Sequence, residues 1–202
     1  MLRIDPATPT TAVARALLGA ALHRRLDDGQ VLSGRIVETE AYLGLEDPAC
    51  HSFHGRRTAR VASMYLDAGH AYVYRIYGLH WCLNVVTGDD ARPEAVLIRA
   101  LAPLAGVERM RSLRGRADDG VRLCAGPARL TQALAIGADL DGHRLGAPPL
   151  WLEAGAPLAE AYVSVGPRVG LSPRVASRDW PLRFWVRADP SVSRGAARRR
   201  GG

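Results

Sequence analysis

Two hairpin signals constrain the fold more than any other feature of this sequence. In the first, Asp27-Asp28-Gly29 separates two extended runs, at 21–26 and 30–40. An Asp-Gly pair between extended runs favours a tight antiparallel hairpin, because glycine readily adopts the positive φ that such turns require. The second run contains several β-branched residues and ends before Gly44 and Asp47-Pro48, which are typical of a loop. The sequence therefore predicts a strand that ends near residue 40 and continues into a loop.

The second hairpin signal is a pair of alternating runs at 71–77 and 81–87, joined by a Gly-Leu-His turn. Both runs are rich in aromatic and β-branched residues, which favour strands. Tyr72 and Tyr74 share one face of the first run and are expected to be buried. Tyr77 lies at the tip, where core packing does not explain a large ring. An exposed ring at a hairpin tip is one way in which proteins enter a stack of bases.

Two carboxylates mark the strand that ends near residue 40. Glu38 and Glu40 are two residues apart and therefore share a face, where they repel each other unless one meets water or a cation. Tyr42 and His51 follow and offer flat faces that would suit a purine or another planar ligand. The alternative is an edge strand whose glutamates are solvated, and the strand alone does not decide between the two interpretations.

Arg99 lies inside the apolar run 96–100, which is predicted to be a further strand. A charged side chain in such a run needs a buried partner or an exit to solvent. Glu40 is a candidate partner. Arg56, Arg57 and Arg60 form a basic cluster after the loop, either in contact with phosphates or simply solvated.

The remaining segments predict three helices and several short strands. The first helix is expected to be capped by Thr10 or Thr11 and to end near Leu18. Further elements are a helix from Pro103 to Leu113, a mobile loop at 115–120, a helix opened by Gly126-Pro127 that continues through Ile136, and strands at 150–153, 161–165 and 182–187.

Composition limits the class of protein. The chain has 202 residues, of which 48% are hydrophobic, enough for one domain with a substantial core. No run approaches the ~20 apolar residues of a membrane span, and the N-terminus lacks the apolar region of a secretion signal. The three cysteines are odd in number and widely spaced, which favours a reducing cytoplasm without disulfide bonds. The expected location is the cytoplasm of a bacterial-type cell, with the nucleoid.

The net charge is +7, which favours polyanionic partners. All 27 basic residues are arginine, and the absence of lysine excludes a lysine Schiff base.

Six segments carry a resemblance to a known family. They read RIVETEAYLGLEDPACHS, AYVYRIYGLHWCLNVV, AVLIRALAPLAG, GPARLTQALAI and, near the end, RVGL with PLRFWVR. Along nearly its whole length the chain resembles the alkyladenine (3-methyladenine) DNA glycosylases. The resemblance implies a compact α+β domain with a curved, mainly antiparallel sheet or open barrel, flanked by helices. It also implies a protruding hairpin that enters the minor groove of duplex DNA so that a damaged purine is flipped out and its N-glycosidic bond is cleaved.

The resemblance also implies roles for individual residues. Glu40 matches the general base, Arg99 the arginine beside the attacking water, and the Val169 carbonyl a further contact of that water. The residues that match the walls and floor of the base pocket are Tyr42, Ala49, His51, Tyr74 and Asn84, and Tyr77 matches the side chain that fills the vacated stack. The expected partner is double-stranded DNA containing damaged purines. We expect a monomer that needs neither a metal nor a cofactor, with one domain at 1–190 and a basic, disordered tail at 191–202.

Four residues depart from the family pattern, namely Phe53, His54, Arg75 and Ala128. They bring the lesion range and the DNA affinity into question.

Two other classes of protein remain as alternatives. A nucleic-acid-binding module that stacks bases without catalysis explains the charge but leaves Glu40 and Arg99 without a role. A zinc hydrolase would need ligands from Asp47, Cys50, His51 and His54, whose spacing is unlike the standard zinc patterns.

Overall fold

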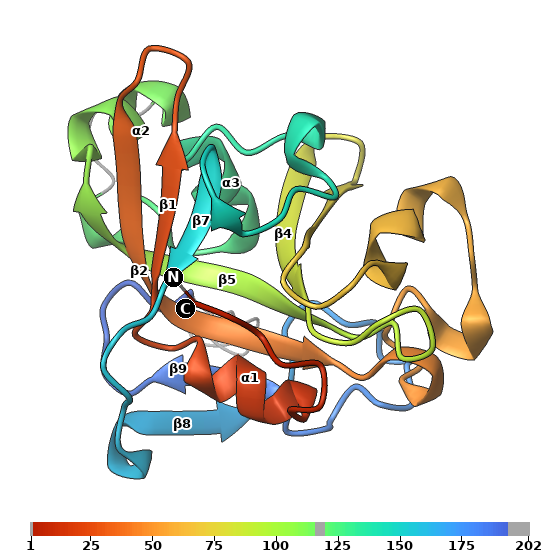
Figure 1. Ribbon diagram of the computed structural model, residues 1–202. Helices are drawn as coiled ribbons and strands as arrows, with labels where there is room; N and C mark the ends of the chain where they lie inside the picture. Colours follow the sequence, from red (N-terminus) through yellow and green to blue (C-terminus); the bar gives the residue numbers. More distant parts are fainter. Residues whose placement is uncertain (1, 116–119, 194–202) are drawn as a thin grey trace.

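An antiparallel sheet forms the centre of the molecule (Figure 1). The computed structural model describes residues 2–115 and 120–193. Within that part of the chain, nine strands pair in the order β3-β4-β5-β2-β1-β7-β6, and β9 pairs with both β2 and β8. The strands are β1 (Ala21–Arg25), β2 (Val31–Tyr42), β3 (Ala71–Ile76), β4 (His80–Val86), β5 (Ala95–Ala105), β6 (Gly146–Ala147), β7 (Leu150–Glu153), β8 (Val163–Gly166) and β9 (Arg183–Val186).

Helices flank the sheet, which confirms the predicted α+β fold. The α-helices are α1 (Thr10–Ala16), α2 (Val107–Arg114) and α3 (Pro127–Ala133). Short 3₁₀ segments fill the connections: η1 (Gly44–Glu46), η2 (Phe53–Gly55), η3 (Ala59–Tyr65), η4 (Gly120–Arg122), η5 (Ala138–Leu140) and η6 (Glu160–Tyr162). In this part of the chain, no helix is long and apolar enough to cross a membrane.

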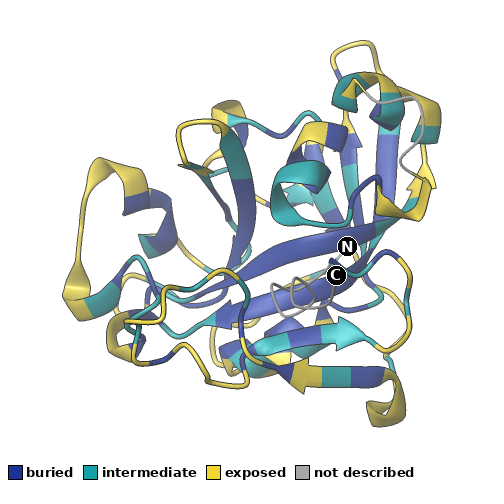
Figure 2. Ribbon diagram, turned by 180° about the vertical axis from the view of Figure 1, so that it is seen from behind, coloured by how far each residue is buried: buried dark blue, intermediate teal, exposed yellow. Residues whose placement is uncertain are grey.

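Strand β2 connects the two halves of the sheet. Its first part pairs with β1, from Val31 to Arg35, whereas Glu38, Thr39 and Glu40 pair with β9. On its other side β2 pairs with β5 along most of its length. Gly34 permits this close approach, because a Cβ at this position would lie 2.9 Å from the Cβ of Leu101. The change of partner leaves the middle of β2 enclosed on both edges, and residues 36–41 are buried, as the dark blue ribbon in the centre of Figure 2 shows.

The hydrophobic core has two parts. The larger cluster packs α1, α2 and α3 against β1, β2, β4 and β5. A smaller cluster lies beside the loop that follows β2 and consists of Cys50, Val61, Met64, Tyr72, Val86 and Ala95. Side chains of this second cluster also line the pocket described below, so the same packing supports the fold and the site.

Both predicted hairpins are confirmed. β1 and β2 are antiparallel around a turn in which Gly29 has a φ of 83°, and β3 and β4 are antiparallel around Tyr77 and Gly78. The three late strands are also present, as β7, β8 and β9.

Three details of the prediction are wrong. The N-cap of α1 is Pro9, and the hydroxyl of Thr10 instead contacts Thr87 and Glu94. Residues 103–105 belong to β5, and α2 starts only after Gly106, whose φ of 75° ends the strand. A proline is tolerated at position 103 because the pairing of β2 with β5 is irregular there. The third helix ends at Ala133, three residues before the predicted Ile136.

The C-terminal boundary also differs from the expectation. Ser191 and Ser193 are 3% and 7% exposed, so the packed chain continues beyond residue 190. The rest of the predicted basic tail, residues 194–202, lies outside the described residues, as do residues 116–119 of the predicted mobile loop.

Candidate active site

A small pocket of about 110 Å³ opens beside the end of β2. All five residues that were predicted to bind a base line it: Tyr42, Ala49, His51, Tyr74 and Asn84. The structure adds Cys50, Met64, Tyr72, Ala95 and Leu171. Five separate parts of the chain therefore meet at one cavity: the end of β2 with its loop, η3, the β3–β4 hairpin, the start of β5 and the loop after β8.

Aromatic rings form much of the wall. Tyr72 and Tyr74 stack with ring centroids 5.2 Å apart, and His51 meets Tyr74 edge-on at 4.6 Å. His51 Nδ1 and the Tyr72 hydroxyl are hydrogen-bonded at 2.7 Å. Tyr72 was predicted only as a buried residue. Its position two residues before Tyr74 on β3 was the sequence signal that could have placed it in the pocket.

The imidazole of His51 is neutral at physiological pH. Burial lowers its pKa to about 4, with a further contribution from the charges of Arg60 and Arg56. A neutral ring does not repel a positively charged ligand. The pocket thus offers flat, uncharged faces.

Asn84 forms part of the pocket lining and is 3% exposed. Its side-chain amide donates a hydrogen bond of 3.0 Å to the carbonyl of Tyr72, the residue opposite it on β3. The amide group is therefore held by the hairpin, while its carbonyl oxygen is the polar atom left for a ligand. Asn84 is therefore both a pocket residue and a residue held within the hairpin.

Glu40 lies on β2, two residues before Tyr42, and is fully buried. The Tyr42 hydroxyl donates to its Oε2 at 2.9 Å, the backbone N–H of Val169 donates to its Oε1 at 2.6 Å, and Arg99 Nη1 lies 3.2 Å from Oε1. The predicted pairing of Glu40 with Arg99 is confirmed. Val169 was predicted to act through its carbonyl, and its N–H supplies the contact seen with Glu40.

A bulge in β5 aims Arg99 at this carboxylate. Glu38 lies opposite Ala100 and Thr39 opposite Ile98, so Arg99 has no partner on β2. An extra residue of this kind redirects a side chain. Burial lowers the pKa of Arg99, but the negative charges of Glu40 and Glu38 outweigh it, and the pKa lies above its usual value.

Glu38 is also fully buried, so the alternative of an edge strand with solvated glutamates is wrong. Arg99 Nε donates to Glu38 at 3.0 Å, and Arg183 Nε donates at 2.7 Å. The two arginines balance the charge of the two carboxylates, so neither enclosed carboxylate is left unpaired.

A buried ion pair fixes the two loops around the site. Asp47 and Arg168 form a bidentate contact in which both side chains are fully enclosed, and the Ser177 hydroxyl donates to Asp47 at 2.6 Å. Arg168 also lies 4.7 Å from the ring centroid of Tyr42. Because Arg168 precedes Val169, this pair holds the N–H that contacts Glu40.

Among the described residues, His, Cys, Asp and Glu side chains do not gather in threes as metal ligands would. The residues Asp47, Cys50, His51 and His54 therefore do not form the zinc site of the alternative interpretation.

The tip of the β3–β4 hairpin lies outside the core. Tyr77 is 86% exposed, and its φ of 51° is unusual for a residue other than glycine. Gly78 follows with a φ of 66°, and Leu79 N–H bonds to Ile76 O at 3.1 Å to close the turn. Strained residues of this kind concentrate at functional sites.

Comparison with known proteins establishes the family. The methylpurine-DNA glycosylase (MPG) family model matches residues 5–190. The chain belongs to this family. Human DNA-3-methyladenine glycosylase is 45% identical over 196 residues, which cover 92% of this chain and 65% of the human protein. The mouse DNA-3-methyladenine glycosylase is 46% identical over 197 residues, which cover 92% of this chain and 58% of the mouse protein. A Carboxydothermus hydrogenoformans protein, assigned by its name to the 3-methyladenine DNA glycosylases, is 46% identical over 183 residues, which cover 90% of this chain and 92% of that protein. The chain thus spans less than two thirds of the length of the two mammalian relatives, and most of the length of the Carboxydothermus hydrogenoformans protein.

Membership of the methylpurine-DNA glycosylase family confirms the resemblance found in the sequence. It makes the chain a DNA glycosylase of base excision repair, with DNA as its substrate. The alternative of a binding module without catalysis is therefore wrong.

The four departures from the family pattern lie outside the lining of the base pocket. Phe53 and His54 belong to η2, where their rings are 3.7 Å apart. Arg75 lies over Trp81 at the far side of the hairpin, and Ala128 is in the first turn of α3. They are therefore placed to affect contacts around the site rather than the walls of the pocket.

Proposed function

We propose that this chain flips alkylated or deaminated purine nucleotides out of duplex DNA and hydrolyses their N-glycosidic bond, leaving an intact abasic site. One observation carries the proposal. Glu40, paired with Arg99, accepts a hydrogen bond from Tyr42, which is a wall of the aromatic pocket. A base held in this pocket would bring its glycosidic bond close to a buried carboxylate.

The pocket suits a purine that carries positive charge. The faces of Tyr42, Tyr74 and Tyr72 are rich in π electrons, and such faces attract cations. N-alkylated purines are often cationic, whereas the undamaged bases are neutral. Selection would therefore begin with the charge of the base, and the neutral His51 would not oppose it.

Glu40 is proposed to act as the general base. Bond cleavage develops positive charge on the sugar, which a nearby carboxylate stabilises, and the same group can accept a proton from the attacking water. Within the described contacts, Glu40 Oε2 accepts one hydrogen bond, from Tyr42, and so retains capacity for a water. Arg99 and the carbonyl of Val169 are proposed to orient that water. A cationic base leaves without being protonated, so one carboxylate is enough for it, whereas a neutral base such as hypoxanthine must gain a proton as it leaves.

The surrounding surface supports the handling of DNA. Tyr77 is proposed to enter the duplex from the minor groove and to fill the space that the flipped nucleotide leaves. The net charge of +7 favours attraction to the phosphate backbone. We further propose that the protein acts as a monomer in the cytoplasm, at the nucleoid.

An excision assay tests this function. The substrate is a labelled duplex with one ethenoadenine or one hypoxanthine, and the product is developed by heat and alkali, which break the strand at abasic sites. We expect a break at the lesion only after this treatment and no break in the undamaged duplex. A lesion strand that stays intact through heat and alkali, with folded protein in excess, would contradict the proposal.

A further inference from the structure

We infer that Ser193 is a positioning residue, which together with Glu38 holds Arg99 in place beside Glu40. The assignment rests on the proposed function, because it concerns the groups that would orient the attacking water. Ser193 lies on the segment that was expected to be a tail outside the domain. It is 7% exposed, and its side chain reaches the charged groups beneath the active site.

Glu38 is the centre of these contacts. Its Oε1 accepts hydrogen bonds from Arg99 Nε at 3.0 Å, Arg183 Nε at 2.7 Å and the Ser193 hydroxyl at 2.9 Å. Its Oε2 accepts the backbone N–H of Ser193 at 2.7 Å. Four hydrogen bonds hold this carboxylate, three of them at Oε1, so Glu38 is suited to anchor its neighbours.

The hydroxyl of Ser193 bridges two members of this network. It donates to Glu38 and accepts a hydrogen bond from Arg99 Nη2 at 3.4 Å. Arg183 Nη2 in turn donates to the carbonyl of Ser193 at 3.4 Å. Residue 193 is thus fixed through its N–H, its carbonyl and its side chain.

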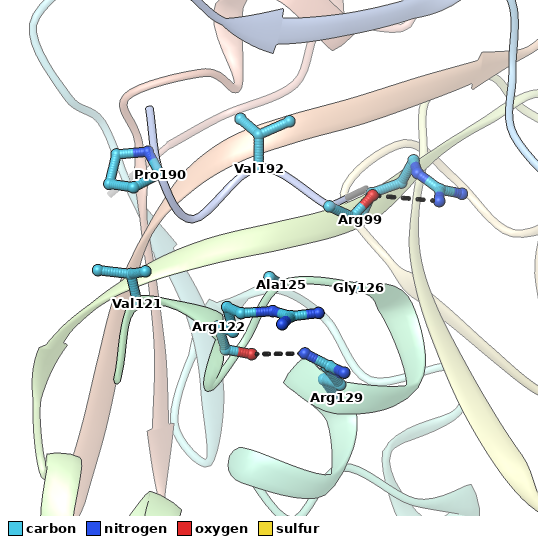
Figure 3. Close-up of a pocket in the computed structure, with 9 residues that line it drawn as sticks. Arg99, Val121, Arg122, Ala125, Gly126, Arg129, Pro190 and Val192 are labelled. Carbon is cyan, nitrogen blue, oxygen red and sulfur yellow. Dashed lines mark hydrogen bonds between the residues drawn. The ribbon is translucent and has the colours of Figure 1, made fainter. Parts of the chain in front are cut away.

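These contacts determine the orientation of Arg99. Its Nε faces Glu38, its Nη1 faces Glu40 and its Nη2 faces Ser193. A guanidinium is planar, so the loss of one fixed contact permits a rotation that moves the other two. Figure 3 shows Arg99 beside a second pocket, of about 330 Å³, which Ser193 also lines. On that side the guanidinium borders open volume, and Ser193 is the group that restrains it.

The test is single-turnover excision by the full chain with Ser193→Ala. This variant removes the hydroxyl but retains the backbone N–H bond to Glu38, so it should fold. We expect the maximal rate to fall by about ten-fold or more, because small displacements of catalytic groups have large effects on rate. The enzyme concentration at half-maximal rate should stay within two-fold of wild type, since the pocket and the hairpin are unchanged.

Two variants provide controls. Ser193→Thr keeps the hydroxyl, and the adjoining pocket has room for the extra methyl group, so its rate should return to near that of wild type. Ser191→Ala alters a buried serine of the same segment whose backbone N–H bonds to Asp189, and it should leave the rate unchanged. A second measurement uses Glu38→Gln, in which adding Ser193→Ala should cause little further loss, because the shared contact is already broken.

The outcomes separate the two proposals. If wild type excises the base and Ser193→Ala does so at the same rate, the positioning role is overturned while the proposed function stands. An equal loss in Ser191→Ala, or a loss in Ser193→Ala that threonine does not restore, also overturns it. A wild-type protein that releases no base overturns the proposed function and this assignment with it.

Discussion

At the scale of single residues, Glu40 has an environment that permits a mild substitution. Its Oε1 faces the N–H of Val169, and its Oε2 faces a hydroxyl, which can accept as well as donate. Glu40→Gln can therefore place its carbonyl toward Val169 and its amide toward Tyr42, and we expect the fold and lesion binding to persist. The rate of excision should fall at least ~10²-fold, because an amide cannot take up the proton of water. Single-turnover rates near those of wild type would mean that another group is the base.

Asn84 supplies a prediction about selectivity. Guanine differs from adenine by a 2-amino group in the minor groove, and a well-filled pocket floor can exclude it. A serine side chain is shorter than asparagine and opens this floor. We expect Asn84→Ser to raise the excision of guanine relative to hypoxanthine by about ten-fold, since one pocket contact changes discrimination by ~1–3 kcal/mol. Single-turnover rates for both bases opposite thymine measure the ratio. An unchanged ratio in a folded variant would leave Asn84 as a hairpin residue and direct attention to the loop around Ala49.

His51 supplies a prediction about pH. Its pKa in the folded protein is about 4, below the ordinary value of 6.5. As the pH falls below 6.5, the unfolded chain takes up a proton that the folded chain does not bind until about pH 4, so the free energy of unfolding decreases across this window. His51→Gln lacks this titration. Between pH 7 and 4.5, the unfolding free energy of wild type should therefore fall relative to that of this variant, by up to about 2 kcal/mol. Urea unfolding at several pH values measures the difference. A constant difference would show that His51 does not titrate in this way.

At the scale of elements, the β3–β4 hairpin carries Tyr77 at its tip. The ring makes little contact with the core, so Tyr77→Ala should leave the free energy of unfolding nearly unchanged. It should weaken the flipped state, because nothing fills the gap in the duplex. A fluorescent base analogue at the target position should report less extrusion with the variant than with wild type. Equal extrusion would show that Tyr77 is not the inserted side chain.

The elements also show which features a sequence can predict. The Asp-Gly turn and the alternation in 71–87 are local signals, and both hairpins followed from them. The bulge that aims Arg99 depends on the register between β2 and β5, which no local pattern records. The start of α2 was misjudged because residues 103–105 are held in β5 by pairing with distant residues 33 and 34. Ser193 was assigned to a tail because its partner, Glu38, is far away in the sequence.

At the scale of the whole molecule, the absence of lysine limits the chemistry. Of the groups that can form a Schiff base with an abasic site, only the α-amine remains. We therefore expect an intact abasic product and no strand cleavage without alkali. Borohydride in the reaction should trap no covalent adduct, whereas a bifunctional glycosylase that uses a lysine gives one under the same conditions. A stoichiometric adduct with this chain would contradict the expectation.

The hairpin has a consequence for how the molecule surveys DNA. Tyr77 at the tip and Tyr72, Tyr74 and Asn84 in the pocket belong to the same two strands. Any shift of the hairpin therefore moves the inserted ring and the pocket wall together. If Tyr77 enters the minor groove as proposed, a narrow groove, as in runs of A·T pairs, would keep out the tip and would keep the pocket away from the bases as well. The width of the groove would then decide which parts of a genome are inspected, before the chemistry of any base is tested.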